Sequence, residues 1–257
     1  MTRQEMDQRA WDTCDIILIS GDAYIDHPSF GTAIIGRFLE SMGYRVGVIA
    51  QPDFQNVETF RVLGPPRLFW GITAGNVDSQ LARLTVMRKL RHDDAYTPGG
   101  QSGKRPPNAS IVYSSMARQA FKGIPVVLGG IEASLRRFAY YDYWTDKVRR
   151  SLIFDAKADL IAFGMAESTI AEIAKRLHNN EDLHGIRGTA EICRELPDSQ
   201  SIIEIPSYEA VSAPNAQGKI EFSKMTRLIM ENYRSDKSVL AQKHDNRWLV
   251  VNPPSPP

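Results

Sequence analysis

Cysteine is scarce in this sequence, with two residues among 257. Cys14 and Cys193 lie far apart, and neither belongs to a CxxC or Cys/His spacing that is typical of metal sites. Two free thiols are expected, with no cysteine-held metal. The sequence also lacks a long hydrophobic run: its first fifteen residues are polar and charged, so neither a signal peptide nor a membrane span is predicted.

Charge of one sign is not in excess, because 31 Lys and Arg residues face 30 Asp and Glu residues. Such a balance creates no bulk field toward nucleic acid or an anionic membrane. No GxGxxG fingerprint occurs. The segment GGQSGKRP is not a P-loop, since Pro98 replaces a required glycine and Arg105 replaces the magnesium-binding Ser or Thr. We expect a cytoplasmic protein without a nucleic-acid or membrane partner.

Short apolar runs of strand length are present, and they alternate with longer segments of helical period. The runs are continuous, as in parallel strands that are buried on both faces. They cover residues 14–20, 45–50, 67–73, 124–130 and 158–164. Helical spacing follows in residues 33–42, 112–121, 148–153 and 170–177, and Gly43 stands where a helix C-cap glycine belongs.

These patterns predict two regions. Residues 1–185 are expected to form an α/β domain with a Rossmann-like parallel sheet and helices on both faces. Residues 186–257 are expected to form a small α+β extension, with strands at 201–206 and 247–251 and a helix at 221–234. The extension ends in NPPSPP, which is typical of a linker toward a further domain.

Polar residues and glycines gather where the predicted strands end, and open α/β sheets bind ligands at that edge. Glycine lets the backbone approach a ligand closely, and a helix N-terminus offers free N–H groups. The candidate ligand-binding residues are Asp22, Tyr24, Asp26, His27, Ser29, Gly31, Gly75, Asn76, Asp78, Gly129, Gly130, Glu132, Arg136, Arg137 and Glu167. Helix capping and tight turns are the alternative explanation for several of them.

Several candidates have two or more interpretations. Three interpretations of His27 are open: it is a metal ligand, a proton donor, or a structural histidine hydrogen-bonded to Asp22 or Asp26. Glu132 and the two following arginines form either a buried ion pair or a clamp for an anionic substrate. The loop at 91–110, which is too long for an ordinary connection, is either functional or a mobile excursion.

Five segments carry a resemblance to a known family. GDAYIDHPSFGTAIIGR, AGNVDS, DDAYTPGG, VLGGIEASLRR and YYDYWTDKVRRS are similar to the amino-terminal region of the YgiQ family of radical SAM proteins. The resemblance covers nearly the whole chain. It implies a parent enzyme in which a following TIM-like barrel holds a 4Fe-4S cluster through CxxxCxxC and binds S-adenosylmethionine. Two cysteines cannot supply that cluster, so the resemblance implies that the barrel lies elsewhere on the same polypeptide.

A broader resemblance concerns the order of strand, polar loop and helix, which is similar to flavodoxin-like cobalamin-binding domains. It implies a flat ligand over the strand ends, with cobalamin as one candidate. In that group an Asp-x-His-x-x-Gly motif provides the axial histidine of cobalt. Here the aspartate adjoins His27 and Gly31 follows four residues later, so the spacing departs from the motif and does not predict cobalt ligation.

The function expected from these features is an accessory domain that binds a small molecule and covers a radical SAM active site. One alternative is a stand-alone binding module for a cobalamin- or nucleotide-like molecule, which the linker-like end disfavours. Another is a nucleotide-dependent enzyme that uses Asp22, His27 and Glu132 as acid or base. The absence of both nucleotide motifs weighs against it.

Overall fold

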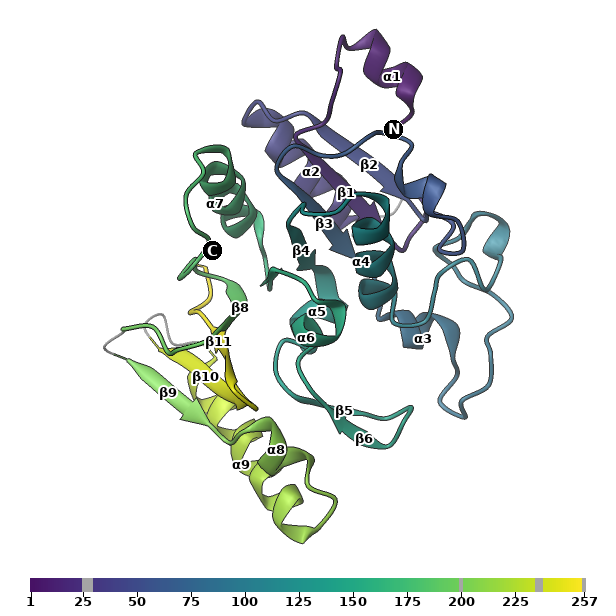
Figure 1. Cartoon of the computed structure of the whole chain (residues 1–257). Coiled ribbons are helices and arrows are strands. Elements are labelled where there is room, and N and C mark those ends of the chain that lie inside the picture. Colours follow the sequence, from purple (N-terminus) through teal and green to yellow (C-terminus); the bar gives the residue numbers. More distant parts are fainter. Residues whose placement is uncertain (25–29, 199–200, 234–237, 256–257) are drawn as a thin grey trace.

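One nine-stranded sheet runs through the computed structural model, which describes residues 1–24, 30–198, 201–233 and 238–255 (Figure 1). In spatial order its strands are β2 (Val46–Ala50), β1 (Ile16–Ser20), β3 (Phe69–Thr73), β4 (Val126–Gly129), β7 (Leu160–Ala162), β8 (Thr189–Cys193), β11 (Arg247–Val251), β10 (Val239–His244) and β9 (Ile202–Ile205). A separate hairpin pairs β5 (Tyr140–Asp142) with β6 (Lys147–Arg149).

The first five strands of this order are parallel and form what we call the parallel half. The order 2-1-3-4 and then β7 is the flavodoxin-like arrangement. Helices α2 (Gly31–Ser41) and α7 (Glu167–His178) contact each other, and α4 (Ala109–Ala120) packs against α6 (Leu152–Ala156). The side chains form two hydrophobic clusters, as expected for a sheet covered on both faces. The predicted α/β fold is confirmed.

The remaining helices are short except for one. They are α1 (Arg3–Gln8), η1 (Val57–Phe60), α3 (Ser79–Arg83), η2 (Pro98–Gly100), α5 (Gly130–Leu135), α8 (Tyr208–Ser212) and α9 (Ala216–Asn232). The predicted C-cap of α2 is present: Gly43 has a φ of 89°, and its N–H donates to the carbonyl of Glu40.

The last four strands, β8, β11, β10 and β9, form what we call the antiparallel half. Strand β8 pairs antiparallel with β7, β11 with β8, and β10 with β11, while β9 joins β10 in parallel. Strands β8 and β10 were not predicted. Val148, expected in a helix, lies in β6 instead. Because the sheet continues across residue 185, the division into two domains stays a prediction.

The end of β11 determines where the described chain leaves the sheet. Two antiparallel pairings separate β11 from β7, so both strands run in the same direction. Asn252 donates its N–H to the carbonyl of Thr189, and Gly188 donates to Pro253. The described chain therefore leaves at the edge where the parallel strands end.

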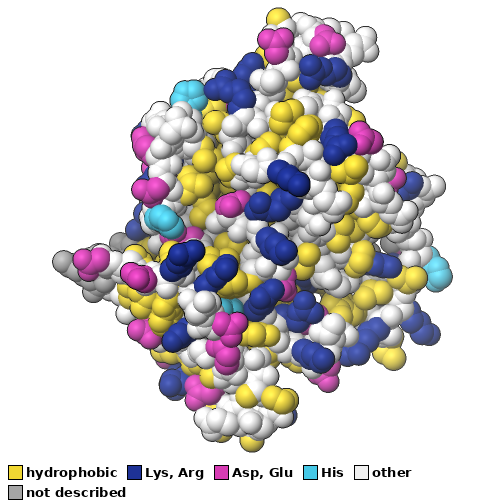
Figure 2. Space-filling model, in the orientation of Figure 1, with side chains coloured by type: hydrophobic (Ala, Val, Ile, Leu, Met, Phe, Trp, Pro, Cys, Tyr) yellow, Lys and Arg dark blue, Asp and Glu magenta, His cyan; other side chains and the backbone are white. Residues whose placement is uncertain are grey.

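The surface fits the balanced composition. On the face drawn in Figure 2, Lys and Arg side chains lie interspersed with acidic and apolar side chains. Among the described residues, no helix combines the length and the apolar character needed to cross a membrane.

Candidate functional site

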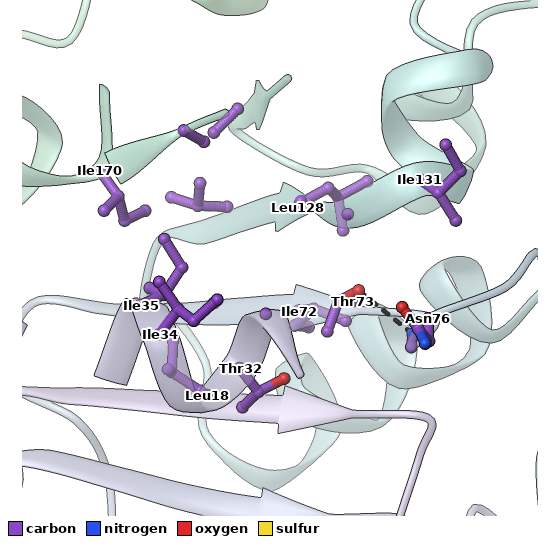
Figure 3. Close-up of a pocket in the computed structure, with 18 of the residues that line it drawn as sticks. Leu18, Thr32, Ile34, Ile35, Ile72, Thr73, Asn76, Leu128, Ile131 and Ile170 are labelled. Atoms are coloured by element: carbon purple, nitrogen blue, oxygen red, sulfur yellow. Dashed lines mark hydrogen bonds between the residues drawn. The ribbon is translucent and has the colours of Figure 1, made fainter. Parts of the chain in front are cut away.

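A cavity of about 320 Å³ opens at the carboxyl ends of the parallel strands, between α2 and α7 (Figure 3). Its walls are mostly aliphatic. The branched aliphatic side chains that line it are Leu18, Ile34, Ile35, Ile72, Val127, Leu128, Ile131 and Ile170, and Phe30 and Met165 also contribute. Such a lining suits the apolar part of a small molecule.

The strand order places the cavity here. The chain leaves β1 through α2 to reach β2 on one side, whereas β3 lies on the other side of β1. Where the order reverses in this way, the connections diverge and leave a crevice beyond the strand ends. The cavity lies beside this switch point.

Glycines let the backbone form part of the cavity wall. A Cβ on Gly71, in the middle of β3, would lie 2.6 Å from the Leu18 side chain. Gly130 has a φ of 78°, and a Cβ there would lie 2.3 Å from the Thr73 hydroxyl oxygen. A side chain at either position would displace a lining residue, so glycine keeps this space open.

The candidate residues fall into three groups. Those that line the cavity are Asp22, Gly31, Gly75, Asn76, Gly129, Gly130 and Glu167. Those that the structure describes outside its lining are Tyr24, Asp78, Glu132, Arg136 and Arg137. Asp26, His27 and Ser29 lie outside the described residues.

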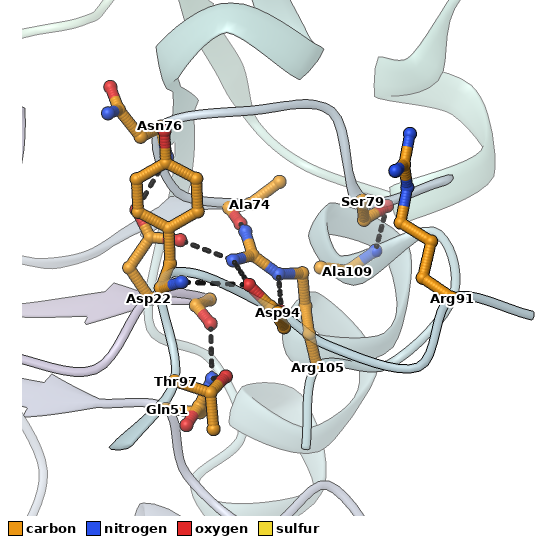
Figure 4. A network of polar contacts seen from close by, with 12 residues as sticks. Asp22, Gln51, Ala74, Asn76, Ser79, Arg91, Asp94, Thr97, Arg105 and Ala109 are labelled. Carbon is orange, nitrogen blue, oxygen red and sulfur yellow. Dashed lines mark hydrogen bonds and ion pairs between the residues drawn. The ribbon is translucent and has the colours of Figure 1, made fainter. Parts of the chain in front are cut away.

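Asp22 belongs to a buried ion network at the ends of β1 and β3 (Figure 4). One carboxylate oxygen lies 2.6 Å from Arg105 Nη2, and the other accepts the N–H of Asn76 at 2.6 Å. Arg105 also contacts Asp94 at 3.3 Å and donates to the carbonyl of Ala74 at 2.6 Å. Asp22 and Arg105 are only 2% and 3% exposed, so the charges neutralise each other away from water.

The tight packing around this network has two consequences. Burial raises the pKa of Asp22 above its ordinary value, against the opposing effects of Arg105 and the Asn76 amide. Gly75 has a φ of 103°, and a Cβ there would lie 2.2 Å from an Asp22 oxygen. The turn after β3 therefore requires glycine.

The long loop at 91–110 supplies Arg105 and Asp94 to the network, so in this structure it is an ordered part of the strand-end region. In the sequence, Arg105 stands out only as a position where the P-loop pattern fails. The available signal was an arginine eleven residues after an aspartate, in a loop too long for a plain connection.

A second buried network contains Glu132, which is 1% exposed. Its carboxylate accepts the N–H of Ser79 at 2.8 Å and the N–H of Ser110 at 3.2 Å. Arg136 lies 3.9 Å from Glu132 and 2.5 Å from Asp78, and Asp78 also caps α3. Burial and the Glu132 charge raise the pKa of Asp78. These contacts join α3, α4 and α5 and correspond to the ion-pair interpretation.

Two further candidates have other surroundings. Arg137 donates to the carbonyl of Ser134, and its guanidinium lies 4.6 Å from the centre of the Phe163 ring. Burial lowers its pKa. Tyr24 is 62% exposed. Its ring makes an edge-to-face contact with the ring of Phe30, which lines the cavity.

These surroundings limit the chemistry of the cavity. The carboxylates of Asp22 and Glu132 are engaged by arginine and backbone N–H groups, which disfavours a role in proton transfer. Among the described residues that line the cavity there is no Cys or His. Cys14 precedes β1 and Cys193 ends β8, and two separated thiols do not fit a 4Fe-4S cluster. The apolar lining suits the binding of a small molecule.

Comparison with known proteins identifies the family: the Radical SAM N-terminal family matches residues 1–257, and the chain belongs to it. A UPF0313 protein of Rhodopseudomonas palustris is 48% identical over 282 residues, covering 100% of this chain and 41% of the relative. A UPF0313 protein of Vibrio parahaemolyticus is 58% identical over 211 residues, covering 81% of this chain and 27% of the relative. The chain thus spans less than half of these relatives' length.

Among solved structures, the chain is similar to the radical S-adenosylmethionine methyltransferase TsrM of Kitasatospora setae, whose structure contains cobalamin and a 4Fe-4S cluster. The sequence identity is 18%, the TM-score is 0.47, and the match covers 70% of this chain and 27% of TsrM. No site residue is transferred from this comparison.

Proposed function

We propose that this chain is the ligand-binding amino-terminal domain of a longer radical SAM enzyme and that it holds a small molecule at the strand ends. The observation that carries the proposal is the apolar cavity at the topological switch point. The ligand is a substrate or a cofactor whose apolar, flat part enters between α2 and α7. Cobalamin is one candidate for it.

The position of the following catalytic region is part of the same proposal. The relatives are longer than this chain, and the described chain leaves the sheet at the edge where the cavity opens. A barrel that follows β11 therefore starts beside the cavity. In this arrangement the domain covers the active site and presents its ligand to it, while cluster and S-adenosylmethionine chemistry belongs to the barrel.

Binding by the chain itself tests the proposal. We would measure its melting temperature with hydroxocobalamin, S-adenosylmethionine and adenine nucleotides, because a ligand at 100 times its Kd adds about 2.7 kcal/mol of stability. The matched variant is Gly129→Leu: a Cβ there would have Ala162 O at 3.9 Å as its nearest neighbour, so the larger side chain enters the cavity. We expect it to weaken binding about tenfold or more, equivalent to about 1.4 kcal/mol.

Lys122→Leu is the control, since Lys122 is exposed and precedes β4 at the opposite edge of the sheet. It should bind as the wild type does. If none of the ligands stabilises the chain, or if Gly129→Leu binds as well as Lys122→Leu, the cavity is not the binding site. Equal affinity in this chain and in a full-length relative would instead favour a binding module that needs no barrel.

A further inference from the structure

The antiparallel half has one face that no helix of the described residues covers. Helices α8 and α9 pack on the opposite face, where Val211 and Met225 join the larger hydrophobic cluster. Strand β8 contributes Glu191 and Cys193 to the uncovered face, because residues two apart on a strand point to the same side. A second cavity, of about 810 Å³, opens there and is lined by both residues.

Three different donor groups meet at the wall of this second cavity. They are the imidazole of His184, the carboxylate of Glu191 and the thiol of Cys193, and their donor atoms all lie within 4.8 Å of one another. His184 Nδ1 is 2.5 Å from Glu191 Oε2. The sequence indicated no metal site, because His184 stands seven residues before Glu191 and this spacing matches no common metal-binding motif. A turn between the two residues brings their side chains together.

Neighbouring groups orient these donors. Glu191 is 4% exposed, and its Oε1 accepts from the N–H of Gly185 and from Asn252 Nδ2, both at 2.9 Å. Its Oε2 therefore faces the other two donors. The backbone of His184 is fixed on both sides, since its N–H donates to Asp182 and its carbonyl accepts from Arg176 at 2.9 Å. Ligating carboxylates are commonly held by such hydrogen bonds, as Glu191 is here.

We propose that His184, Glu191 and Cys193 bind one divalent cation of the zinc type at the wall of the second cavity. Imidazole, carboxylate and thiolate are the ligands of zinc, whereas a thiolate disfavours Mg²⁺ and Ca²⁺. On binding, the thiol releases its proton to the solvent and the cation replaces the direct contact between His184 and Glu191. Three protein ligands leave the fourth position of a tetrahedral site open to the cavity. This site is independent of the cavity between α2 and α7.

Titration of the intact chain with Co²⁺ tests the site, because cobalt bound by a thiolate gives a sulfur-to-metal charge-transfer band that Zn²⁺ should abolish by competition. The chain offers a matched pair of variants. Cys193→Ser should lose the band, whereas Cys14→Ala should keep it, since Cys14 is the other free cysteine and lies in the core beside Met6. Circular dichroism confirms that both variants are folded.

A second variant, at an exposed ligand, separates loss of metal binding from loss of folding. The side chain of His184 is 71% exposed, so His184→Ala should fold normally and bind Co²⁺ and Zn²⁺ at least about tenfold more weakly. A band that survives Cys193→Ser, or affinity that is unchanged in His184→Ala, overturns the proposal. So does the absence of any band in the wild type, which would leave His184 and Glu191 as a hydrogen-bonded pair.

Discussion

The two halves of the sheet differ in how their faces are covered. In the parallel half both faces are covered, so every residue of β1 is buried, and the buried carboxylates Asp22 and Asp78 near the strand ends each pair with an arginine. In the antiparallel half α8 and α9 cover one face, and polar residues such as Glu191 and Gln242 lie within the strands themselves. Antiparallel sheets tolerate such a one-sided core.

The difference shows where each half places its polar chemistry. The parallel half concentrates it at the strand ends, where backbone N–H groups and glycines are available. The antiparallel half carries it within the strands, as Glu191 and Cys193 of β8 show. Perturbing one half at a time should therefore give effects of different size.

The largest effect is expected in the parallel half. Arg105→Ala leaves Asp22 and Asp94 buried without a counter-charge, which should lower the free energy of unfolding by about 3–5 kcal/mol. Urea denaturation measures the loss. The neighbouring Lys104→Ala is the control, because Lys104 is exposed and its replacement should change stability by less than about 0.5 kcal/mol. A loss below about 1 kcal/mol for Arg105→Ala would mean that water reaches the two carboxylates.

An intermediate, pH-dependent effect is expected where the halves meet. His244 of β10 is stacked between Phe154 of α6 and Tyr208 of α8, and burial lowers its pKa from 6.5 to about 4. A lowered folded-state pKa means that the neutral form is favoured on folding. This contribution is complete above about pH 6.5 and is lost as the pH falls toward 4, up to about 3 kcal/mol.

His244→Phe keeps an aromatic ring at this position but removes the titrating group. Urea denaturation at pH 7 and at pH 4.5 should show that the variant loses less stability than the wild type between these values. His92→Gln serves as the comparison, since His92 is exposed and should keep the wild-type dependence. Equal pH dependence in wild type and His244→Phe would show that the imidazole has the same pKa in the folded and the unfolded chain.

The smallest effect is expected in the helix that covers the antiparallel half. Asn215 caps α9 by accepting the N–H of Gly218 at 2.9 Å, so Asn215→Ala should destabilise the chain by about 1 kcal/mol. Thermal unfolding measures this change. The exposed Lys219→Ala in the same turn should be close to neutral. A result for Asn215→Ala that matches Lys219→Ala would mean that solvent replaces the cap.

The sequence predicted the parallel half better than the antiparallel half, for a physical reason. Strands buried on both faces are continuous apolar runs, and the run that contains Ile16–Ser20 was recognised directly. The segment Thr189–Cys193 mixes polar and apolar residues over five positions, too short a stretch to separate a strand from a loop. Val148 was assigned to a helix because helical spacing to Leu152 also arises when a strand and a helix follow each other closely.

The sequence placed the candidate residues at the strand ends; several of them line the cavity there, and their role in ligand binding stays a prediction. Gly129, Gly130 and Asn76 line the cavity because strand ends share one edge of a parallel sheet. Arg105 could not be assigned to that edge, since nothing in a loop sequence states where the loop returns. The apolar lining from α2 and α7 was also missed, because helix faces reveal burial but not the gap between two helices.

By itself, the sequence determined the alternation of strands and helices, the α/β class, and the gathering of glycines and polar residues at strand ends, since these follow from local periodicity and backbone freedom. The tertiary structure alone decided the strand order that opens the cavity, the pairing of Arg105 with Asp22, and the meeting of His184, Glu191 and Cys193. Such contacts join residues across turns and long loops, and their energies depend on burial and distance, which only the folded chain defines.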